Sequence, residues 1–280
     1  MDKPAGPTSH DAVARVRRAL GVKAVGHAGT LDPFATGLLV ILVGPATRLA
    51  RFVERERKTY LAEARLGIRT ATDDPTGEVI PGDPPSEWPG PEQVAEELAR
   101  LVGPQRQVPP AYSAKKVGGE RSYRLARRGA AVALKPVAIT VFAADLVEYR
   151  PPLVRFRCTV SPGTYIRALA RDLGEALGTG AHLAALRRER IGPFGVEDAT
   201  PLDRVTGAER LIPAERLVAG LPPVPLAEAE VGAVAHGRDV KRDGETSGEA
   251  ALLADGRLVA IAEAVPGGWH PAVVLPAADR

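Results

Sequence analysis

A stretch from Gly26 to Leu39 places one acid and one histidine among small residues, and these two side chains are suited to chemistry. Asp32 follows His27 by five residues and directly precedes Pro33, which favours an extended or turn conformation for the aspartate backbone. The glycines and alanines around it would let a large partner approach the backbone closely. A lone Asp-Pro pair is usually only a tight turn, and for this segment taken alone that interpretation stays open.

Regular elements on both sides would hold this stretch in place. Residues 38–43 form an apolar run, which predicts a buried strand that keeps the loop rigid. Residues 58–68 alternate between apolar and polar side chains and predict a half-buried strand with Tyr60 on its apolar face. Asp-Asp-Pro-Thr-Gly at 73–77 predicts a turn. Further predicted elements are helices over 9–20, 46–56 and 91–101, a hairpin of strands 137–149 and 153–160, a helix that buries Leu169, Leu173 and Leu177, and a strand from Ala184.

The totals exclude several classes of protein. The 280 residues suffice for one large and one small domain, and no apolar run reaches the 18 residues of a membrane-spanning helix. The N-terminus lacks the basic and apolar pattern of a signal peptide. Cys158 is the only cysteine, so there is no disulfide framework and no cysteine metal site, and its apolar strand face predicts a core residue. We therefore expect a cytoplasmic protein.

Charge is segregated along the chain. Residues 70–99 carry eight acids and no base, whereas residues 100–135 carry nine bases and one acid. The second segment interleaves its bases with Tyr112 and Tyr123, and it includes a predicted basic helix over 123–128. Such a segment suits a surface that grips RNA. The alternative interpretation is a solvated insertion.

The last part of the chain predicts a separate small β domain. Prolines at 222, 223 and 225 predict a linker. Short strands are expected at 250–254, 258–264 and 272–275, with an Asp-Gly turn between the first two. No internal repeat or low-complexity tract interrupts the chain.

Six short motifs combine polar side chains with glycines, prolines or aromatic residues. In chain order they are Asp2-Lys3-Pro4, Gly26-His27 with Gly29-Thr30-Leu31-Asp32-Pro33, Lys58-Thr59-Tyr60, Pro109-Pro110 with Tyr112-Ser113-Ala114 and Lys116, Gly163-Thr164-Tyr165-Ile166-Arg167, and Leu186-Arg187-Arg188. Several motifs in a fixed order are far more specific than any one of them.

In that order the motifs resemble those of the TruB-type tRNA pseudouridine-55 synthases, closely over residues 2–200 and loosely over 222–276. The resemblance implies an α+β pseudouridine synthase fold, in which helices flank a mixed, largely antiparallel central sheet. It also implies a catalytic domain over 1–220 with a basic RNA-gripping insertion at 103–135, and a small β-rich PUA-like domain over 221–280. The family usually has an apolar strand before Asp2, whereas here only Met1 precedes it. We expect either a truncated chain or a late start, with the folding of that sheet edge affected.

The implied reaction is the isomerisation of uridine to pseudouridine at position 55 in the T-loop of tRNA. It needs no redox cofactor, ATP or metal, and the sequence has no Walker loop and no His/Cys cluster. Asp32 is the implied catalytic carboxylate, which either attacks C1′ or removes the C2′ proton. Arg167 would pair with it and keep it ionised, unless it is only a surface helix arginine. Tyr60 would stack on the uracil and help to remove the C5 proton, which is compatible with a place in the core.

Four further residues are implied to bind the substrate. His27 would fill the gap that the flipped base leaves. Tyr165 and Leu186 would line the pocket, although core packing explains Leu186 equally well. Lys3 would order the loop near Asp32 or touch a phosphate.

The expected partner is the T-arm stem-loop of tRNA, bound by a monomer without a guide RNA or a membrane. Two other functions stay open: a non-catalytic RNA-binding protein or tRNA chaperone, and a guide-RNA-dependent pseudouridine synthase subunit. A retaining glycosidase needs a second acid about 5 Å from the first, and these motifs contain no second acid.

Overall fold

The computed structural model describes residues 1–82, 85–112, 116–117, 120–121, 134–208, 211–242 and 246–276. Two compact units make up the chain, and each is described by itself. The first unit contains Asp32 and comprises Met1–Ser9, Leu31–Leu39 and Arg55–Leu202. The second contains His27 and comprises His10–Thr30, Val40–Glu54 and Asp203–Arg280.

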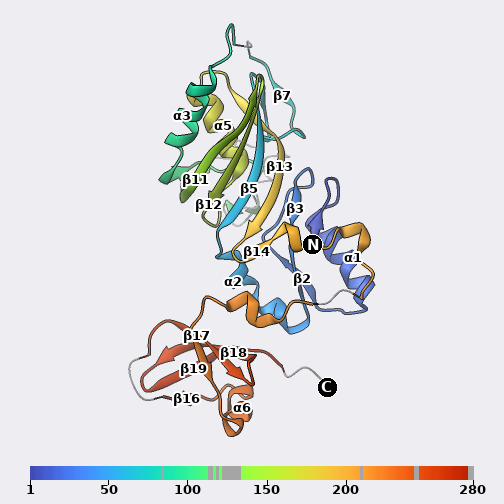
Figure 1. Ribbon diagram of the computed structural model, residues 1–280, viewed down its shortest axis with the longest axis vertical. Coiled ribbons are helices and arrows are strands. Elements are labelled where there is room, and N and C mark those ends of the chain that lie inside the picture. Colours follow the sequence, from blue (N-terminus) through green and yellow to red (C-terminus); the bar gives the residue numbers. More distant parts are fainter. Residues whose placement is uncertain are drawn as a thin grey trace. The chain divides into compact units, whose positions relative to one another are not determined.

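A mixed sheet forms the centre of the first unit (Figure 1). Its strands in spatial order are β1 (Asp2–Lys3), β3 (Thr36–Leu38), β13 (Ala181–Ile191), β5 (Lys58–Leu66), β12 (Leu153–Val160), β11 (Val137–Arg150) and β8 (Gly103–Gln107), and β14 (Phe194–Gly195) also pairs with β13. Only β3 and β13 run parallel; the other neighbouring pairs are antiparallel. This arrangement confirms the predicted mixed, largely antiparallel sheet.

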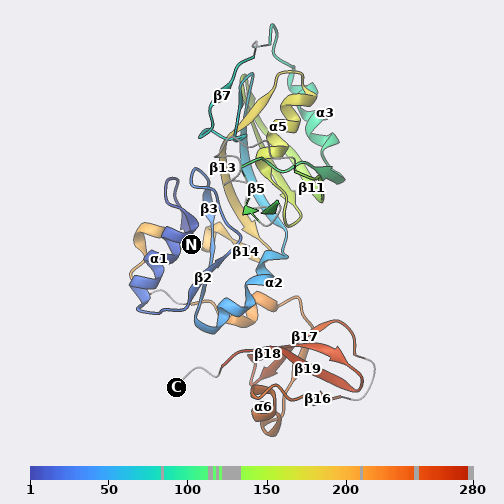
Figure 2. The same cartoon turned by 180° about the vertical axis from the view of Figure 1, so that it is seen from behind.

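Two helices, α3 (Pro91–Arg100) and α5 (Ile166–Ala176), cover one face of this sheet (Figure 2). The helix α3 packs on β11 through its buried residues Val94 and Leu98, while α5 packs on β13 and β5. Leu169 and Leu173 face the sheet because apolar residues four positions apart share one side of a helix. The helix α5 carries Arg167 in its first turn. Two short antiparallel strand pairs lie outside this sheet: β6 (Arg69–Thr70) pairs with β7 (Val79–Ile80), and β9 (Lys116–Val117) pairs with β10 (Glu120–Arg121).

The central strands show the predicted alternation. Buried and more exposed residues alternate along β5, and Tyr60 lies on its buried side. Along β12 the buried positions include Phe156 and Cys158. Cys158 is 1% exposed, and burial raises the pKa of its thiol to about 12. It is the core residue that was predicted.

The predicted single strand over 38–43 is wrong. The chain leaves the central sheet after Leu38, and β4 (Val40–Val43) pairs instead with β2 (Val25–Ala28) in the second unit. Between them, Leu39 donates its backbone N–H to the carbonyl of Met1 at 2.9 Å. Apolar periodicity could not reveal this change of partner, because both segments are apolar. His27 consequently lies on β2 and not in a loop.

The first edge of the central sheet forms despite the short N-terminus. Asp2 and Lys3 pair with Leu38 and Gly37 of β3. The backbone N–H of Asp2 also donates to the carbonyl of Thr200. The expected weakness of this edge is therefore not visible in its pairing.

The second unit contains α1 (Ser9–Leu20), which begins at the boundary, and the β2–β4 pair. The predicted helix over 46–56 is divided into a 3-10 helix over Gly44–Leu49 and α2 (Ala50–Glu54). Short 3-10 turns occupy Val196–Asp198 in the first unit, Leu202–Arg204 where the chain passes from the first unit to the second, and Ala214–Val218 in the second.

A five-stranded sheet and one helix, α6 (Glu228–Ala235), form the C-terminal part of the second unit. Two of the predicted linker prolines, Pro223 and Pro225, are part of a parallel edge strand, and the carbonyl of Pro222 just before it accepts the N–H of Ala251 at 3.0 Å. This β-rich part is consistent with the predicted PUA-like domain. The strands in spatial order are β15 (Pro223–Pro225), β17 (Glu249–Ala254), β18 (Arg257–Val265), β19 (Gly268–Val274) and β16 (Val240–Lys241).

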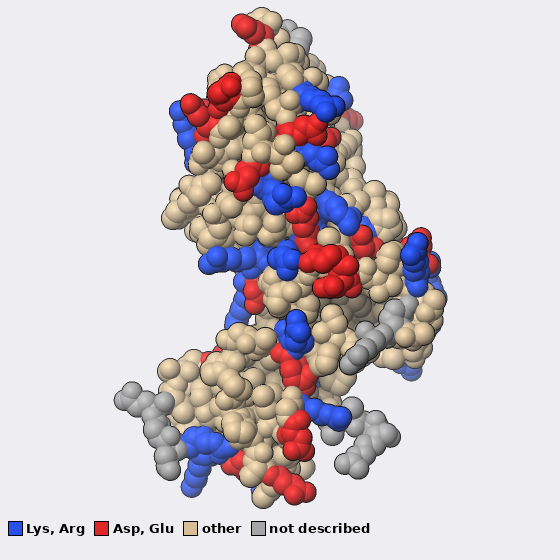
Figure 3. Space-filling model, viewed as in Figure 1, with Lys and Arg blue, Asp and Glu red and all other residues tan. Residues whose placement is uncertain are grey.

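The predicted basic insertion at 103–135 begins with a strand of the fold. Residues 103–107 are β8, an edge strand of the central sheet that pairs with β11. The predicted helix over 123–128 lies outside the described residues. On the face drawn in Figure 3, basic and acidic side chains are interspersed. Within the described parts of the chain, no helix is long and apolar enough to cross a bilayer.

Candidate active site

Asp32 lies on a turn that the N-terminal residues hold from several sides. The Ser9 hydroxyl accepts a hydrogen bond from the N–H of Leu31 and donates one to the carbonyl of Leu31, at 3.0 and 3.1 Å. The carbonyl of Pro33 accepts the N–H of Gly6 at 2.8 Å. Because these bonds fix the residues before and after Asp32, its carboxylate has a defined position.

Lys3 completes this support. Its side chain is fully buried, and its ammonium donates to the carbonyls of Pro4 and Pro7 at 2.8 Å and of Pro33 at 3.3 Å. A lysine held in this way is not accessible to a phosphate. Of the two roles considered for Lys3, the geometry therefore favours ordering of the Asp32 turn.

Gly37 shows why one of the small residues is needed. Its φ is +98°, and a Cβ at this position would lie 2.3 Å from the carbonyl oxygen of Arg188 on β13. Gly37 therefore permits close approach of a neighbouring strand, not of a substrate. The buried guanidinium of Arg188 reaches the same region and donates from Nε to the carbonyl of Leu38 at 2.7 Å.

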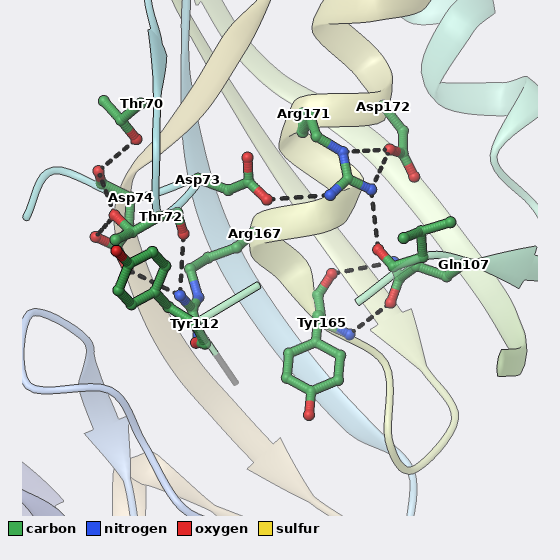
Figure 4. Close-up of polar contacts among 11 residues, drawn as sticks. Thr70, Thr72, Asp73, Asp74, Gln107, Tyr112, Tyr165, Arg167, Arg171 and Asp172 are labelled. Carbon is green, nitrogen blue, oxygen red and sulfur yellow. Dashed lines mark hydrogen bonds and ion pairs between the residues drawn. The ribbon is translucent and has the colours of Figure 1, made fainter. Parts of the chain in front are cut away.

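Arg167 is brought to Asp32 as expected. Its Nε lies 3.1 Å from Oδ2 of Asp32, and its side chain is 7% exposed while that of Asp32 is 38% exposed. The other two nitrogens are engaged too: Nη1 contacts the carboxylate of Asp74 and the carbonyl of Thr72, and Nη2 contacts the carbonyl of Tyr112, each at 3.0 Å (Figure 4). The alternative of a surface arginine is excluded by this burial.

Asp74 is the residue that sequence reasoning missed. Its side chain is as buried as that of Arg167, and its Oδ2 forms the 3.0 Å ion pair with Nη1. Its Oδ1 accepts hydrogen bonds from the hydroxyls of Thr72 and Thr76 and from the N–H of Thr76, between 2.6 and 2.9 Å. The segment 73–77 was expected to be an ordinary turn. Its one signal is the set of threonines around the acid, which suits a buried carboxylate as well as a solvated turn.

The electrostatics of Asp32 reflect these neighbours. Burial raises the pKa of the Asp32 carboxyl and Asp74 adds to this effect, while Arg167 and Lys3 oppose it. The net direction is upward. The expected effect of Arg167 is present, but burial outweighs it.

A second arginine of α5 lies one turn further along the helix. Arg171 contacts the carboxylates of Asp73 and Asp172 at 3.1 and 2.7 Å, and it donates to the carbonyl of Val108 at 3.0 Å (Figure 4). Burial raises the pKa of Asp73, and Arg171 opposes that rise. Neither Asp73 nor Arg171 was singled out from the sequence.

The other predicted site residues are distributed as follows. Tyr60 is 8% exposed on β5, and within the described residues it makes no hydrogen bond with Asp32 or Arg167. Leu186 is 9% exposed on β13, and its carbonyl accepts the hydroxyl of Thr36 at 3.3 Å. Tyr165 immediately precedes α5.

His27 belongs to the second unit. Its ring meets that of His10 edge to face, with centroids 5.6 Å apart.

Within the described residues, no group of three or more acids, histidines or cysteines is arranged to hold a metal ion.

Comparison with known proteins defines the class. Residues 17–166 match the model of the TruB family pseudouridylate synthase N-terminal domain, and residues 167–219 match that of the tRNA pseudouridylate synthase B C-terminal domain. The chain belongs to the TruB family of pseudouridylate synthases, which confirms the resemblance and the isomerase class.

Individual relatives agree with this assignment. A protein of Thermobifida fusca (strain YX) named tRNA pseudouridine synthase B is 45% identical over 98% of this chain and 97% of its own length. One of the same name from Mycobacterium sp. (strain KMS) is 43% identical over 98% and 94%.

Among solved structures, the chain is similar to one titled "Structure of H/ACA RNP bound to a substrate RNA containing 2'-deoxyuridine". The TM-score is 0.74 at 26% identity, over 99% of this chain and 84% of the other.

Proposed function

We propose that this enzyme converts uridine to pseudouridine at position 55 in the T-loop of tRNA, with Asp32 as the catalytic carboxylate. One observation carries the proposal: a partly exposed Asp32 carboxylate lies 3.1 Å from the Nε of a buried arginine. Nearly full-length relatives named tRNA pseudouridine synthase B support the choice of substrate.

In the proposed reaction the N1–C1′ bond of the nucleotide breaks, the uracil turns, and C5 bonds to C1′. The C5 proton is lost and N1 gains one, so the atoms balance without a cofactor. Asp32 supplies the ionised oxygen, either as a nucleophile at C1′ or as a base toward the C2′ proton. Both routes require the carboxylate to be free of its own proton.

Arg167 serves the carboxylate in this proposal. Three of its nitrogens are engaged by protein oxygens, so its guanidinium is committed to the protein and not to a phosphate. It holds Asp32 in place and favours the ionised form. Asp74 in turn holds Arg167, because its Oδ2 contacts the same guanidinium.

Tyr60 is proposed to stack on the uracil and assist removal of the C5 proton. Tyr165 and Leu186 would line the pocket, and Lys3 would act through the Asp32 turn. His27 would support the displaced bases after the target nucleotide is flipped out, a step that costs a few kcal/mol.

The basic segment at 103–135 is proposed to grip the T-arm by contacts from its arginines and lysines to phosphates. Binding should then weaken steeply as salt rises. We also propose catalytic and PUA-like domains that meet at 220/221, and action as a monomer without a guide RNA. The cytoplasm remains the expected location.

A guide-RNA-dependent subunit is the second candidate, because the chain is similar to an H/ACA ribonucleoprotein structure. The 26% identity of that structure is well below the 45% of the tRNA pseudouridine synthase B relative. The binding-only alternative leaves a partly exposed carboxylate on a buried arginine without a use.

The deciding experiment incubates the purified chain with an unmodified T-stem-loop RNA and measures pseudouridine. Wild type should turn over without any guide, and Asp32→Asn should bind the RNA equally well with no turnover. Full isomerisation by Asp32→Asn would reject the catalytic assignment. No turnover by wild type without a guide RNA would favour the second candidate.

A further inference from the structure

The last residue of β8 makes an unusual contact with the start of α5. Gln107 is 1% exposed. Its side-chain Nε2 donates to the carbonyl of Tyr165 at 3.1 Å, and its Oε1 accepts the N–H of Tyr165 at 2.9 Å (Figure 4). A primary amide offers a donor and an acceptor on two separate atoms, so this one side chain bonds to both backbone groups of one residue.

Tyr165 is the residue at which this contact matters. It precedes Ile166, the first residue of α5, and its own side chain makes no capping hydrogen bond. The N–H groups at a helix N-terminus lack partners within the helix and need outside ones, whereas the carbonyl of Tyr165 also accepts the N–H of Leu169 at 3.2 Å. Arg167 follows two residues later, in the first turn. A shift of Tyr165 would therefore move the guanidinium that contacts Asp32.

The chain beyond Gln107 is tied to the same helix. The carbonyl of Val108 accepts Nη2 of Arg171, and that of Tyr112 accepts Nη2 of Arg167, both at 3.0 Å. Residues 107–112 thus contact α5 and the residue just before it at three points. Gln107 is the one of the three whose own side chain makes the contact.

We propose that Gln107 is a positioning residue for the isomerisation: by clamping the backbone of Tyr165 it fixes the first turn of α5 and so holds Arg167 against Asp32. This inference rests on the proposed role of Asp32. It adds a residue of the edge strand β8, on the far side of the sheet order from β3, to the support of the catalytic pair.

Loss of the clamp should have a particular signature. If the first turn of α5 relaxes, Arg167 withdraws from Asp32, while Lys3 and Asp74 continue to face that carboxylate. A displacement of about 1 Å in such a site costs roughly 10²-fold in rate. Removing a nearby positive charge also raises a carboxyl pKa. The acid limb of the pH profile of kcat should then move to higher pH.

The test compares wild type with Gln107→Met, which has a similar length but neither the donor nor the acceptor, on an unmodified T-stem-loop. We expect kcat to fall roughly 10²-fold with little change in KM, and the acid limb to move to higher pH. Ile139→Val is the matched control, because Ile139 is a buried residue of β11 directly paired with β8. It should lower thermal stability without moving the limb.

Gln107→Asn covers the case in which Gln107→Met does not fold. It keeps the amide but withdraws it by one methylene, and it should shift the limb in the same direction. A folded Gln107 variant with the wild-type kcat and acid limb would overturn the inference, and so would an equal shift in Ile139→Val. If wild type itself made no pseudouridine, the proposed function would fail instead.

Discussion

Asp74 and Arg167 form a buried ion pair, with Oδ2 3.0 Å from Nη1 and both side chains 7% exposed. The same guanidinium contacts Asp32 through Nε. Two carboxylates therefore share one cation, and one of them is buried while the other is partly exposed. The buried acid fixes the arginine, and the partly exposed one is the carboxylate that we propose as catalytic.

Asp74→Asn should lower the rate and move the acid limb of the rate profile to lower pH. An amide cannot accept from both Arg167 and the N–H of Thr76, so one of them would face an amide donor. The acid limb should move to lower pH because the charge of Asp74 raises the pKa of Asp32, and the substitution removes that charge. Single-turnover rates between pH 4 and 8 check this. An upward shift would show that Asp74 acts mainly by holding Arg167 near Asp32.

Arg167→Met should abolish most activity and destabilise the fold. Breaking a buried ion pair costs about 3 kcal/mol, and loss of the contact with Asp32 should cost at least about 10²-fold in rate. Arg157→Met is the control, because Arg157 pairs with Glu189 while 49% exposed. That exposed pair should cost less than about 1 kcal/mol. Urea unfolding measures both, and equal losses would contradict the buried role.

Asp32→Asn should be inactive yet more stable than wild type at pH 7. The folded pKa of Asp32 is raised by burial, so the folded state binds its proton more tightly than the unfolded state does. Its contribution to the free energy of unfolding is therefore highest at low pH and falls as pH rises through the folded pKa. Asp32→Asn avoids this loss of stability, because an amide side chain does not ionise. The difference in unfolding free energy between the two proteins should close below about pH 4.

Gly37→Ala should destabilise the protein much more than Gly6→Ala. Both glycines have φ near +100°, but a Cβ at Gly6 meets nothing within 4 Å, whereas at Gly37 it meets the carbonyl of Arg188. The left-handed backbone alone costs about 1–2 kcal/mol, and the clash should add about 1–3 kcal/mol. Thermal unfolding of both variants separates the two effects, and equal losses would mean that β13 simply moves away.

Local patterns predicted the elements whose burial follows their own periodicity. The strand β5 and the helix α5 are examples: β5 has one buried face, and α5 turns its apolar side chains toward the sheet. The residues 38–43 were misjudged because every one is apolar, and pattern alone cannot show which sheet each half joins. Prolines at 222, 223 and 225 suggested a linker, although Pro223 and Pro225 lie in an edge strand, a place in a sheet where proline is tolerated.

Within the candidate site, motif order indicated Asp32 and Arg167, and the structure brings them together. Motif order could not indicate Asp74, because its partner Arg167 lies 93 residues away in the sequence. An Asp-Pro pair within a turn also has the same composition whether the acid is solvated or buried. Gln107 was likewise hidden inside a segment that charge marked as an insertion. Each of these two residues contacts one that the motifs had identified: Asp74 contacts Arg167, and Gln107 contacts Tyr165. Contacts of this kind depend on tertiary packing alone.

Cys158 gives the protein a practical property. The thiolate is the reactive form of cysteine, and this single thiol is both enclosed and hard to ionise. Reagents that label thiols should ignore the folded chain and react only when β12, at the middle of the sheet, becomes exposed. The rate at which Cys158 is labelled therefore measures the rate of global unfolding. A dye placed on an added surface cysteine would report RNA binding without prior removal of the native one.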